Sequence, residues 1–443
     1  MISVRRRALL LPNLIATMAF VTACSGAPQS SAPAAGGAGG GQPQSQGQQS
    51  QAASNSPIKI GYMADANGTS APIAAGMHLG TDLAVQQINA AGGVNGHPIQ
   101  VQYVDPQSDP TQAVQMATQL VQTDNVDVLM GGVLSSECLV VQQLVAKLQV
   151  VYLPTFGCAA EEFSSQFCNR YSFRFEPVGR QEIAPLAEYI VKTYGPHWAM
   201  AYSDYAYGVS QLNAYTAELA KWGGSVTVPI PIPQNEPNLA PYVTKVPTDG
   251  SVNGVIINGL GAGDLTRVSL ALGQYGVAPK VQVIGNSGRD VYGGAYPEFL
   301  NGSVNYQTFL SGVPKNNTYG DAYEKAFRDL AAKEPDWANI LGGADKIQGF
   351  EGYLQYSAMD ALKSAMVSAK FSGRPDTEAL ISALEQVNLP LGADAPGGAM
   401  VMNKGDHQGA QTVYVYRING QQDELLNTIP ADQVPPLGSC KAA

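Results

Sequence analysis

The side chains best suited to chemistry in this sequence are hydroxyls that directly follow apolar runs. The segments "GGVLSSEC", "LPTFGC" and "SDYAYG" each close such a run, and they are rich in small and hydroxyl residues but hold few charges. A hydroxyl group can both donate and accept a hydrogen bond. Because a few placed polar groups in a concave site suffice to hold a small solute, the pattern favours binding.

An amidase or esterase is the enzymatic alternative. The sequence contains neither a GxSxG nor an HExxH motif, and of its histidines (His78, His97, His197 and His407) only His78 falls near a hydroxyl-rich loop. A serine nucleophile without a base is weakly activated, and scattered histidines without a CxxC pair do not form a zinc site. We therefore expect no catalytic residue, no metal and no cofactor; return of the ligand unchanged would distinguish a receptor from this enzyme.

The apolar runs that position these loops are typical of strands, and helical patterns separate them. They are "IKIGYM" from Ile58, "IQVQYVD" from Ile99, "VDVLMGGV" from Val126 and "VVYLPT" from Val150, then "WAMAYSD" from Trp198, "VTVPIPI" from Val226, "VIINGL" from Val255 and "VQVIGN" from Val281. Repeated strand–helix–strand units predict parallel sheets, and two such series predict an α/β fold with two lobes. Ligands of parallel sheets bind beyond the carboxyl ends of the strands, where the hydroxyl-rich loops lie.

The first two intervening helices carry clear signals. Leu79, Leu83 and Ile88 fall on one helical face. Asp109 suits the N-cap of the next helix and Pro110 its first position.

The N-terminus has the features of an export signal. Arg5, Arg6 and Arg7 precede an apolar run that ends at Ala23 and is shorter than the about 20 residues a membrane-spanning helix needs. Val21-Thr22-Ala23-Cys24 resembles the lipobox of bacterial lipoproteins, which implies that Cys24 is lipidated after residues 1–23 are removed. An ordinary signal peptide with an incidental cysteine is the alternative.

Residues 24–56 form a predicted linker. They are rich in Gly, Ser, Pro, Gln and Ala, and they hold no charged residue. Such a segment cannot bury enough apolar surface to offset its chain entropy. We expect a flexible tether that holds an extracytoplasmic body to the bacterial cell membrane through the lipid.

Composition bounds the remaining possibilities. The chain has 443 residues, 45% of them hydrophobic and 14% charged, with a formal net charge of −10. Loss of the three leader arginines makes the exported chain more acidic, whereas nucleic-acid binding needs clustered Lys and Arg. No nucleic-acid partner is therefore expected, and the acidity fits simple solubility.

The exported chain keeps an even number of cysteines for disulfides. With Cys24 lipidated, Cys138, Cys158, Cys168 and Cys440 remain. The short loop "CAAEEFSSQFC" favours Cys158–Cys168 as a pair, which would leave Cys138 and Cys440 for a second.

Several segments, in colinear order, resemble the type I periplasmic binding proteins, above all the branched-chain amino-acid and amide-binding receptors of ABC importers. They are "IKIGYMADANG", "GTDLAVQQINAAGGVNGHPIQVQYVDPQSDPTQAV", "DVLMGGVLSSE" and "YSDYAYG". The resemblance implies two Rossmann-like lobes joined by three crossing strands, near residues 174–177, 303–309 and 396–402. It places residues 57–175 plus 305–397 in the N-terminal lobe and 176–304 plus 398–443 in the C-terminal lobe.

The resemblance also implies binding residues. Ser135 matches the serine that holds an amino acid's carboxylate, with Ser136 beside it, and Thr155 and Gly157 match the polar loop after the next strand. Tyr207 matches the pocket tyrosine of the "YG" motif, and Ile73 the apolar wall. Each has a structural alternative: the serines could cap a helix starting near Glu137, Thr155 could be plain loop, and Tyr207 could be packing.

Two positions depart from the amino-acid binders. Their second-lobe tyrosine falls on Gly261, and the glutamate that pairs with the α-ammonium falls on Ser287, with Asp290 three residues on as a substitute. A buried ammonium without a carboxylate is costly. A carboxylate, amide, urea-like or aromatic solute therefore fits at least as well as an amino acid.

The resulting expectation is a monomeric, lipid-anchored receptor that traps a small polar solute between two closing lobes and passes it to ABC permease subunits. A solute sensor that signals to a partner is the alternative, since both uses need the same lobes.

Overall fold

A four-stranded parallel sheet forms the centre of the first lobe, in the order β2-β1-β3-β4. Its strands are β1 (Ile58–Met63), β2 (Ile99–Val104), β3 (Val128–Gly131) and β4 (Val151–Leu153), which match the four expected from the sequence. β1 is almost entirely buried, as a parallel strand covered by helices on both faces should be.

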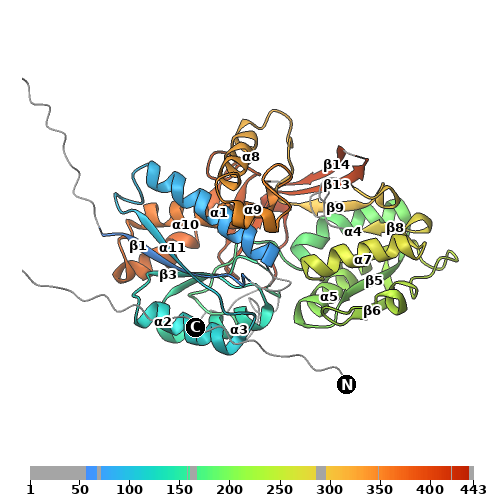
Figure 1. Ribbon diagram of the computed structural model, residues 1–443, viewed down its shortest axis with the longest axis horizontal. Coiled ribbons are helices and arrows are strands. Elements are labelled where there is room, and N and C mark those ends of the chain that lie inside the picture. Colours follow the sequence, from blue (N-terminus) through green and yellow to red (C-terminus); the bar gives the residue numbers. More distant parts are fainter. Residues whose placement is uncertain are drawn as a thin grey trace, which may run out of the picture. The chain divides into compact units, whose positions relative to one another are not determined.

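The structure is a computed structural model that describes residues 56–66, 71–156, 158–159, 167–285, 296–347, 349–420 and 422–438 (Figure 1). The predicted leader and Cys24 lie outside these residues.

Helices cover both faces of the first sheet. They are α1 (Ala71–Ala90), α2 (Pro110–Gln122), α3 (Ser135–Leu148), α8 (Thr318–Ala331), α9 (Pro335–Ile340), α10 (Phe350–Ala369) and α11 (Thr377–Leu384). α1 and α10 lie on one face, and α2 and α3 on the other (Figure 1). Asp109 caps α2 as predicted: its side chain accepts the N–H groups of Thr111 and Gln112, and Pro110 is the first helical residue.

Glycine allows α1 to approach α10 closely. A Cβ added at Gly80 would lie 2.1 Å from the carbonyl oxygen of Gly352, and one at Gly76 would lie 2.2 Å from that of Glu351. Real side chains do not fit at these distances, so the two helices pack backbone against backbone. This contact fixes the position of α1, whose first turn carries Ile73.

The second lobe is built on a seven-stranded sheet in the order β14-β13-β9-β8-β7-β5-β6. Its strands are β5 (His197–Ser203), β6 (Ser225–Ile232), β7 (Gly254–Ile257), β8 (Gln282–Ile284), β9 (Val304–Gln307), β13 (Val413–Asn419) and β14 (Gln422–Ile429). Its helices are α4 (Arg180–Tyr194), α5 (Ala206–Ala220), α6 (Ala240–Val243) and α7 (Ala262–Gln274). β5 to β9 pair in parallel, whereas β13 and β14 extend the sheet as an antiparallel hairpin that the sequence reading did not identify.

A small antiparallel sheet lies in the region of the predicted third crossing. It contains β10 (Asn388–Leu389), β11 (Met400–Asn403) and β12 (Gln408–Gln411). Met400 and Met402 fill the core of the first lobe, although the sequence placed everything after residue 397 in the second. The β11–β12 hairpin therefore packs on the core of the first sheet, while the predicted position of the third crossing, at residues 396–402, stays a prediction.

The first crossing is held against β12 by hydrogen bonds. The Arg174 guanidinium Nε donates to Gln408 Oε1 at 2.6 Å, and the Gly409 N–H donates to the Arg174 carbonyl at 2.6 Å. His407 stacks on Phe173 with 4.0 Å between ring centroids.

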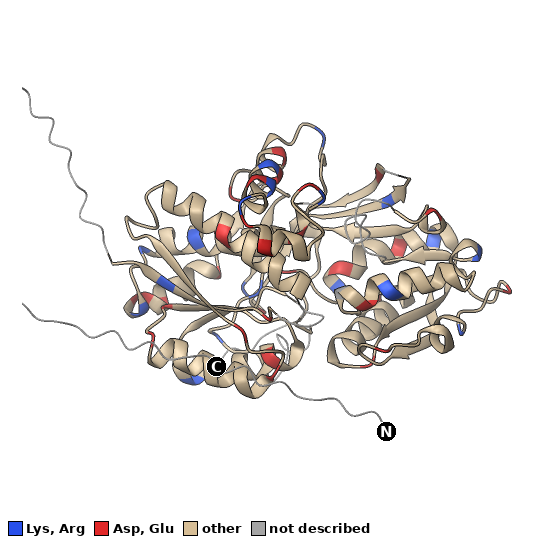
Figure 2. Ribbon diagram, viewed as in Figure 1, with Lys and Arg blue, Asp and Glu red and all other residues tan. Residues whose placement is uncertain are grey.

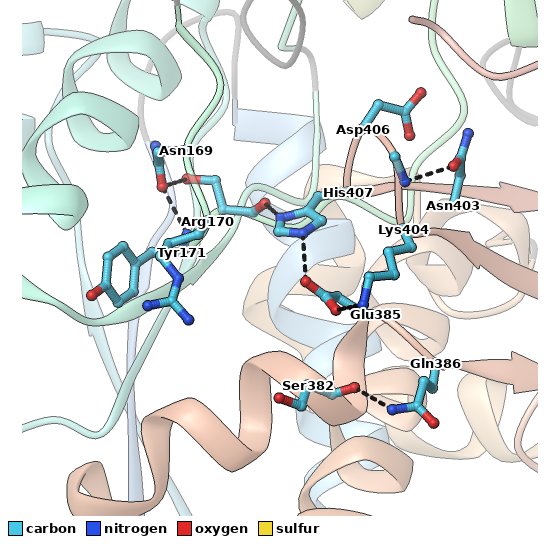
Figure 3. A network of polar contacts seen from close by, with 12 residues as sticks. Asn169, Arg170, Tyr171, Ser382, Glu385, Gln386, Asn403, Lys404, Asp406 and His407 are labelled. Atoms are coloured by element: carbon cyan, nitrogen blue, oxygen red, sulfur yellow. Dashed lines mark hydrogen bonds and ion pairs between the residues drawn. The ribbon is translucent and has the colours of Figure 1, made fainter. Parts of the chain in front are cut away.

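His407 is also held by polar partners (Figure 3). Its Nδ1 lies 3.2 Å from the Ser172 carbonyl oxygen and its Nε2 lies 3.3 Å from Glu385 Oε1. Lys404 pairs with the other oxygen of Glu385 at 2.7 Å.

The disulfide differs from the predicted pairing. Cys138, in α3, is joined to Cys158, after β4, with their Cα atoms 6.0 Å apart. The Cys158–Cys168 pairing was inferred from the short loop between the two residues and is wrong. β3 and β4 are neighbours in the sheet, so α3, which follows β3, brings Cys138 against the segment that follows β4.

Charges of both signs are spread over the helices of both lobes (Figure 2). Within the described ranges, no helix is both long and apolar enough to cross a bilayer. In the same part of the chain, no group of three or more His, Cys, Asp or Glu side chains is placed to hold a metal ion.

Candidate solute-binding site

A cavity of about 290 Å³ opens among the carboxyl ends of strands from both sheets. We call it the main cavity. Its lining comes from the start of α1, the crossings, α4, α5, β9 and α10. The residues are Pro72, Ile73, Phe156, Glu176, Glu182, Tyr207, Asn258, Gly259, Leu260, Leu265, Gly285, Asn305, Tyr306, Gln307, Thr308, Leu341, Phe350, Glu351 and Leu354.

A side cavity of about 50 Å³ adjoins it. The two cavities share Ile73, Phe156, Tyr207 and Leu260 in their linings. Ile73 and Tyr207, both predicted from the sequence, are therefore placed where a bound solute could reach them. Gly261 lines only the side cavity and has open space around its Cα.

Gly208 sets the position of Tyr207. It lies in the first turn of α5, where an added Cβ would come within 2.0 Å of the Ser203 carbonyl oxygen. Only glycine allows the helix to start this close to the end of β5. The glycine of the "YG" pair thus directs the preceding tyrosine into both cavities.

An amide links the hydroxyl of Tyr207 to an acid. The Gln211 Nε2 group donates to Glu182 Oε2 at 2.6 Å and to the Tyr207 hydroxyl at 3.1 Å. Asn258 Nδ2 donates to the Tyr306 hydroxyl at 2.8 Å, and Tyr306 in turn is hydrogen-bonded to Glu182. The main cavity therefore has a wall of connected polar side chains.

Burial controls the protonation of this wall. Burial raises the pKa of Glu182 to about 7, although hydrogen bonds from Gln211 and Tyr306 and the charge of Arg174 act in the opposite direction. Burial, and then the Glu182 carboxylate, raises the pKa of Tyr207 and of Tyr306 well above the usual value. Both tyrosines keep their protons at neutral pH, whereas Glu182 titrates close to it.

The predicted serine and threonine lie outside both cavities. Ser135 is 1% exposed, and its Oγ accepts the N–H of Ala159 at 3.0 Å. The Thr155 hydroxyl is hydrogen-bonded to that of Tyr62 at 2.8 Å. Ser136 is exposed on α3.

The helix cap expected from Ser135 and Ser136 comes from another residue. α3 begins at Ser135 itself, and the Glu137 carboxylate accepts the N–H groups of Val133 and Leu134 at 3.3 and 3.1 Å. Glu137 is 1% exposed and forms an acid pair with Asp65, which is also 1% exposed. Burial, and then the charge of Asp65, raises the pKa of Glu137 well above its usual range.

The predicted contacts Gly157, Ser287 and Asp290 lie outside the described residues. Sequence reasoning missed Glu176, Glu182, Asn305 and Tyr306 in the main cavity. These residues lie in a crossing, at the start of α4 and along β9, not in the strand-end loops. The sequence offered only their position as a signal. Glu176 and Glu182 lie in or shortly after the predicted first crossing, and Asn305 and Tyr306 lie in "VNYQ", within the predicted second crossing.

Comparison with known proteins places this arrangement in a family. Residues 57–423 match the model of a family described as periplasmic binding protein. A protein from Brucella abortus (strain 2308), Leu/Ile/Val-binding protein homolog 7, is 23% identical over 333 residues, which are 69% of this chain and 81% of that protein.

Solved structures share the fold. The leucine-, isoleucine-, valine-, threonine- and alanine-binding protein from Brucella ovis, in a closed conformation, superposes with a TM-score of 0.73 at 20% identity, covering 87% of this chain and 99% of that one. An ABC transporter solute-binding protein from Rhodopseudomonas palustris BisB5, in complex with 3,4-dihydroxybenzoic acid, gives a TM-score of 0.72 at 18% identity, covering 86% and 99%.

Proposed function

Because the chain belongs to the periplasmic binding protein family, we propose that it is an extracytoplasmic receptor that binds a small solute for an ABC importer. The observation that carries this proposal is the main cavity, which is lined by residues from both sheets and by the crossings between them. A hinged pair of lobes that closes on such a site buries the solute and satisfies its hydrogen bonds. No covalent step is required.

Named relatives give the proposal its solute range. The Brucella ovis protein is named for branched-chain and small amino acids, and the Rhodopseudomonas palustris protein holds a dihydroxybenzoic acid. Both ligands are small, with one apolar part and a few polar groups. We assign a solute of that size to this chain.

Tyr207 and Ile73 are the contacts that we propose from the described residues. In this proposal Ser135 and Thr155 do not contact the solute. Their hydroxyls hold the segment after β4 that carries Phe156, which lines the cavity. Ser136 and the three positions outside the described residues, Gly157, Ser287 and Asp290, stay predictions.

Attachment to the membrane belongs to the same proposal. A diacylated Cys24 and the linker of residues 24–56 would keep the receptor beside its permease, since more than one acyl chain gives stable anchoring. We propose that the receptor acts as a monomer.

Equilibrium dialysis against a mixture of metabolites tests the proposed function. We expect mass spectrometry to find one class of unaltered solute enriched with the protein. Tyr207→Ala should lose most of this enrichment, and Tyr275→Ala, at a 45% exposed tyrosine outside both cavities, should keep it. Enrichment of nothing, or release of a chemically changed product, would contradict the proposal.

A further inference from the structure

The main cavity presents negative charge to whatever enters it. Its described lining carries the carboxylates of Glu176, Glu182 and Glu351, and it includes no Lys, Arg or His side chain. The Glu182 and Glu176 carboxylates both act on the Tyr207 hydroxyl, which lines the same cavity. A solute bound there would meet more than one acid.

Asn305 adds a neutral polar side chain to the lining. The residue is 2% exposed and lines the cavity. Its Nδ2 donates to Ser303 Oγ at 3.3 Å, whereas its Oδ1 has no hydrogen-bond partner within the described part of the chain. A buried acceptor left unpaired is unfavourable, and a donor on a solute would satisfy it.

The rest of the lining is largely apolar. Ile73, Phe156, Leu341, Phe350 and Leu354 supply aliphatic and aromatic surface from α1, α10 and the loops beside them. At about 30 Å³ for each water-sized group, the cavity volume of about 290 Å³ holds roughly ten non-hydrogen atoms. The geometry suits a solute with one polar end and a compact apolar body.

We propose that the solute is an organic amine: a positively charged nitrogen head on an apolar body, with no carboxylate. This inference rests on the proposed function. Glu182 and Glu176 would pair with the head, and Asn305 Oδ1 would accept one of its N–H groups. A solute carboxylate would instead meet like charges in a partly dry site, where ionised acids repel strongly.

Binding of an amine in the main cavity should depend on pH. A cation favours the ionised form of Glu182, whose pKa burial raises to about 7. Affinity for an amine should therefore rise about tenfold between pH 6 and pH 8, as that acid loses its proton. The charged and titratable groups that act on Glu182, or on which Glu182 acts, include Arg174, Tyr207, Tyr215 and Tyr306. The pKa of each of the three tyrosines is raised, so none of them loses its proton across this interval.

Three compounds with one shared body test the charge requirement by isothermal titration of the full exported chain. Leucine carries both charges, isopentylamine lacks its carboxylate, and 4-methylpentanoate lacks its ammonium; phenylalanine, 2-phenylethylamine and 3-phenylpropionate repeat the series with a ring. We expect each amine to bind at least tenfold more tightly than its carboxylate counterpart. Equal or tighter binding of the carboxylates would overturn the inference and leave the proposed function intact.

Two variants in α4 test whether Glu182 is the acid that binds the amine. Glu182→Gln should weaken amine binding at least tenfold and remove its pH dependence. Glu188→Gln, in the same helix but 45% exposed and paired with Lys192, should change neither. An unchanged amine affinity in Glu182→Gln would also overturn the inference. If neither series binds and dialysis captures no solute, the proposed function fails with it.

Discussion

At the scale of single residues, the chain buries acids where hydroxyls were expected to act. Ser135 was predicted to hold a ligand carboxylate, yet its Oγ is engaged with Ala159. Behind it, Glu137 and Asp65 share a buried site, and Glu182 faces the main cavity. We therefore expect binding in the main cavity to depend on the protonation of Glu182 more than on a serine hydroxyl.

The buried pair makes stability depend on pH. Burial raises the pKa of Glu137 in the folded protein above its ordinary 4.5. The protonated carboxyl therefore contributes fully to the free energy of unfolding below pH 4.5, and this contribution is lost as the pH rises through the higher pKa of the folded protein. Replacement by glutamine, which cannot ionise, should remove this loss. Between pH 5 and pH 9 we expect the wild type to lose more than about 1.4 kcal/mol relative to Glu137→Gln, the equivalent of one pKa unit.

Urea unfolding of both proteins at several pH values measures the difference. Glu378→Gln is the control, since that acid is 64% exposed in its ion pair with Arg170, and its curve should parallel that of the wild type. Parallel curves for Glu137→Gln and the wild type would refute the assignment.

At the scale of elements, close backbone contacts set the site geometry. α5 can start beside the end of β5 only because Gly208 has no side chain. Gly80 does the same for α1 against α10. These two contacts hold the helix starts that carry Tyr207 and Ile73 into the cavities.

Gly208→Ala should therefore destabilise the protein. The new methyl group would lie 2.0 Å from the Ser203 carbonyl oxygen, and overpacking of this kind costs about 1–3 kcal/mol. Gly263→Ala is the matched control, because Gly263 is also in the first turn of a second-lobe helix and a Cβ there meets nothing within 4 Å. Chemical denaturation should show the loss only for Gly208→Ala; equal stabilities would contradict the close approach.

A second disulfide is the other prediction at this scale. Cys168 is disulfide-bonded, Cys138 and Cys158 bond each other, and Cys440 lies outside the described residues. The N–H of Leu437 donates to Asp406 Oδ2 at 2.9 Å, next to His407 and the Ser172 carbonyl (Figure 3). Since the tail reaches the region of Cys168, we predict the pair Cys168–Cys440.

Peptide mapping of the oxidised protein without reducing agent tests this pair. A linked peptide that contains Cys168 and Cys440 is expected beside one that contains Cys138 and Cys158. A free thiol at Cys440 would rule the second pair out.

The sequence predicted individual strands and helices better than it predicted which distant residues contact one another. Apolar runs such as "IKIGYM" and "VIINGL" fall on β1 and β7 because parallel strands are buried on both faces. β11 and β14 were not predicted, since β11 is only 4 residues long and β14 is largely exposed. The Cys138–Cys158 bond and the acids of the main cavity depend on contacts between distant segments, which local patterns do not encode.

At the scale of the whole molecule, the two large sheets and the segments between them surround a place for a solute. Each large sheet has its own buried core, and the Arg174–Gln408 contact joins the first crossing to β12. Residues from both sides line the main cavity. Binding there would couple the two lobes, which is the property an importer needs from its receptor.

A crystal structure of residues 56–443 with the solute that dialysis enriches shows directly whether the main cavity holds the solute. We expect density for that solute in the main cavity, in contact with Tyr207 and with a nitrogen beside Glu182. Density outside this cavity, or a solute whose carboxylate faces Glu182, would contradict it.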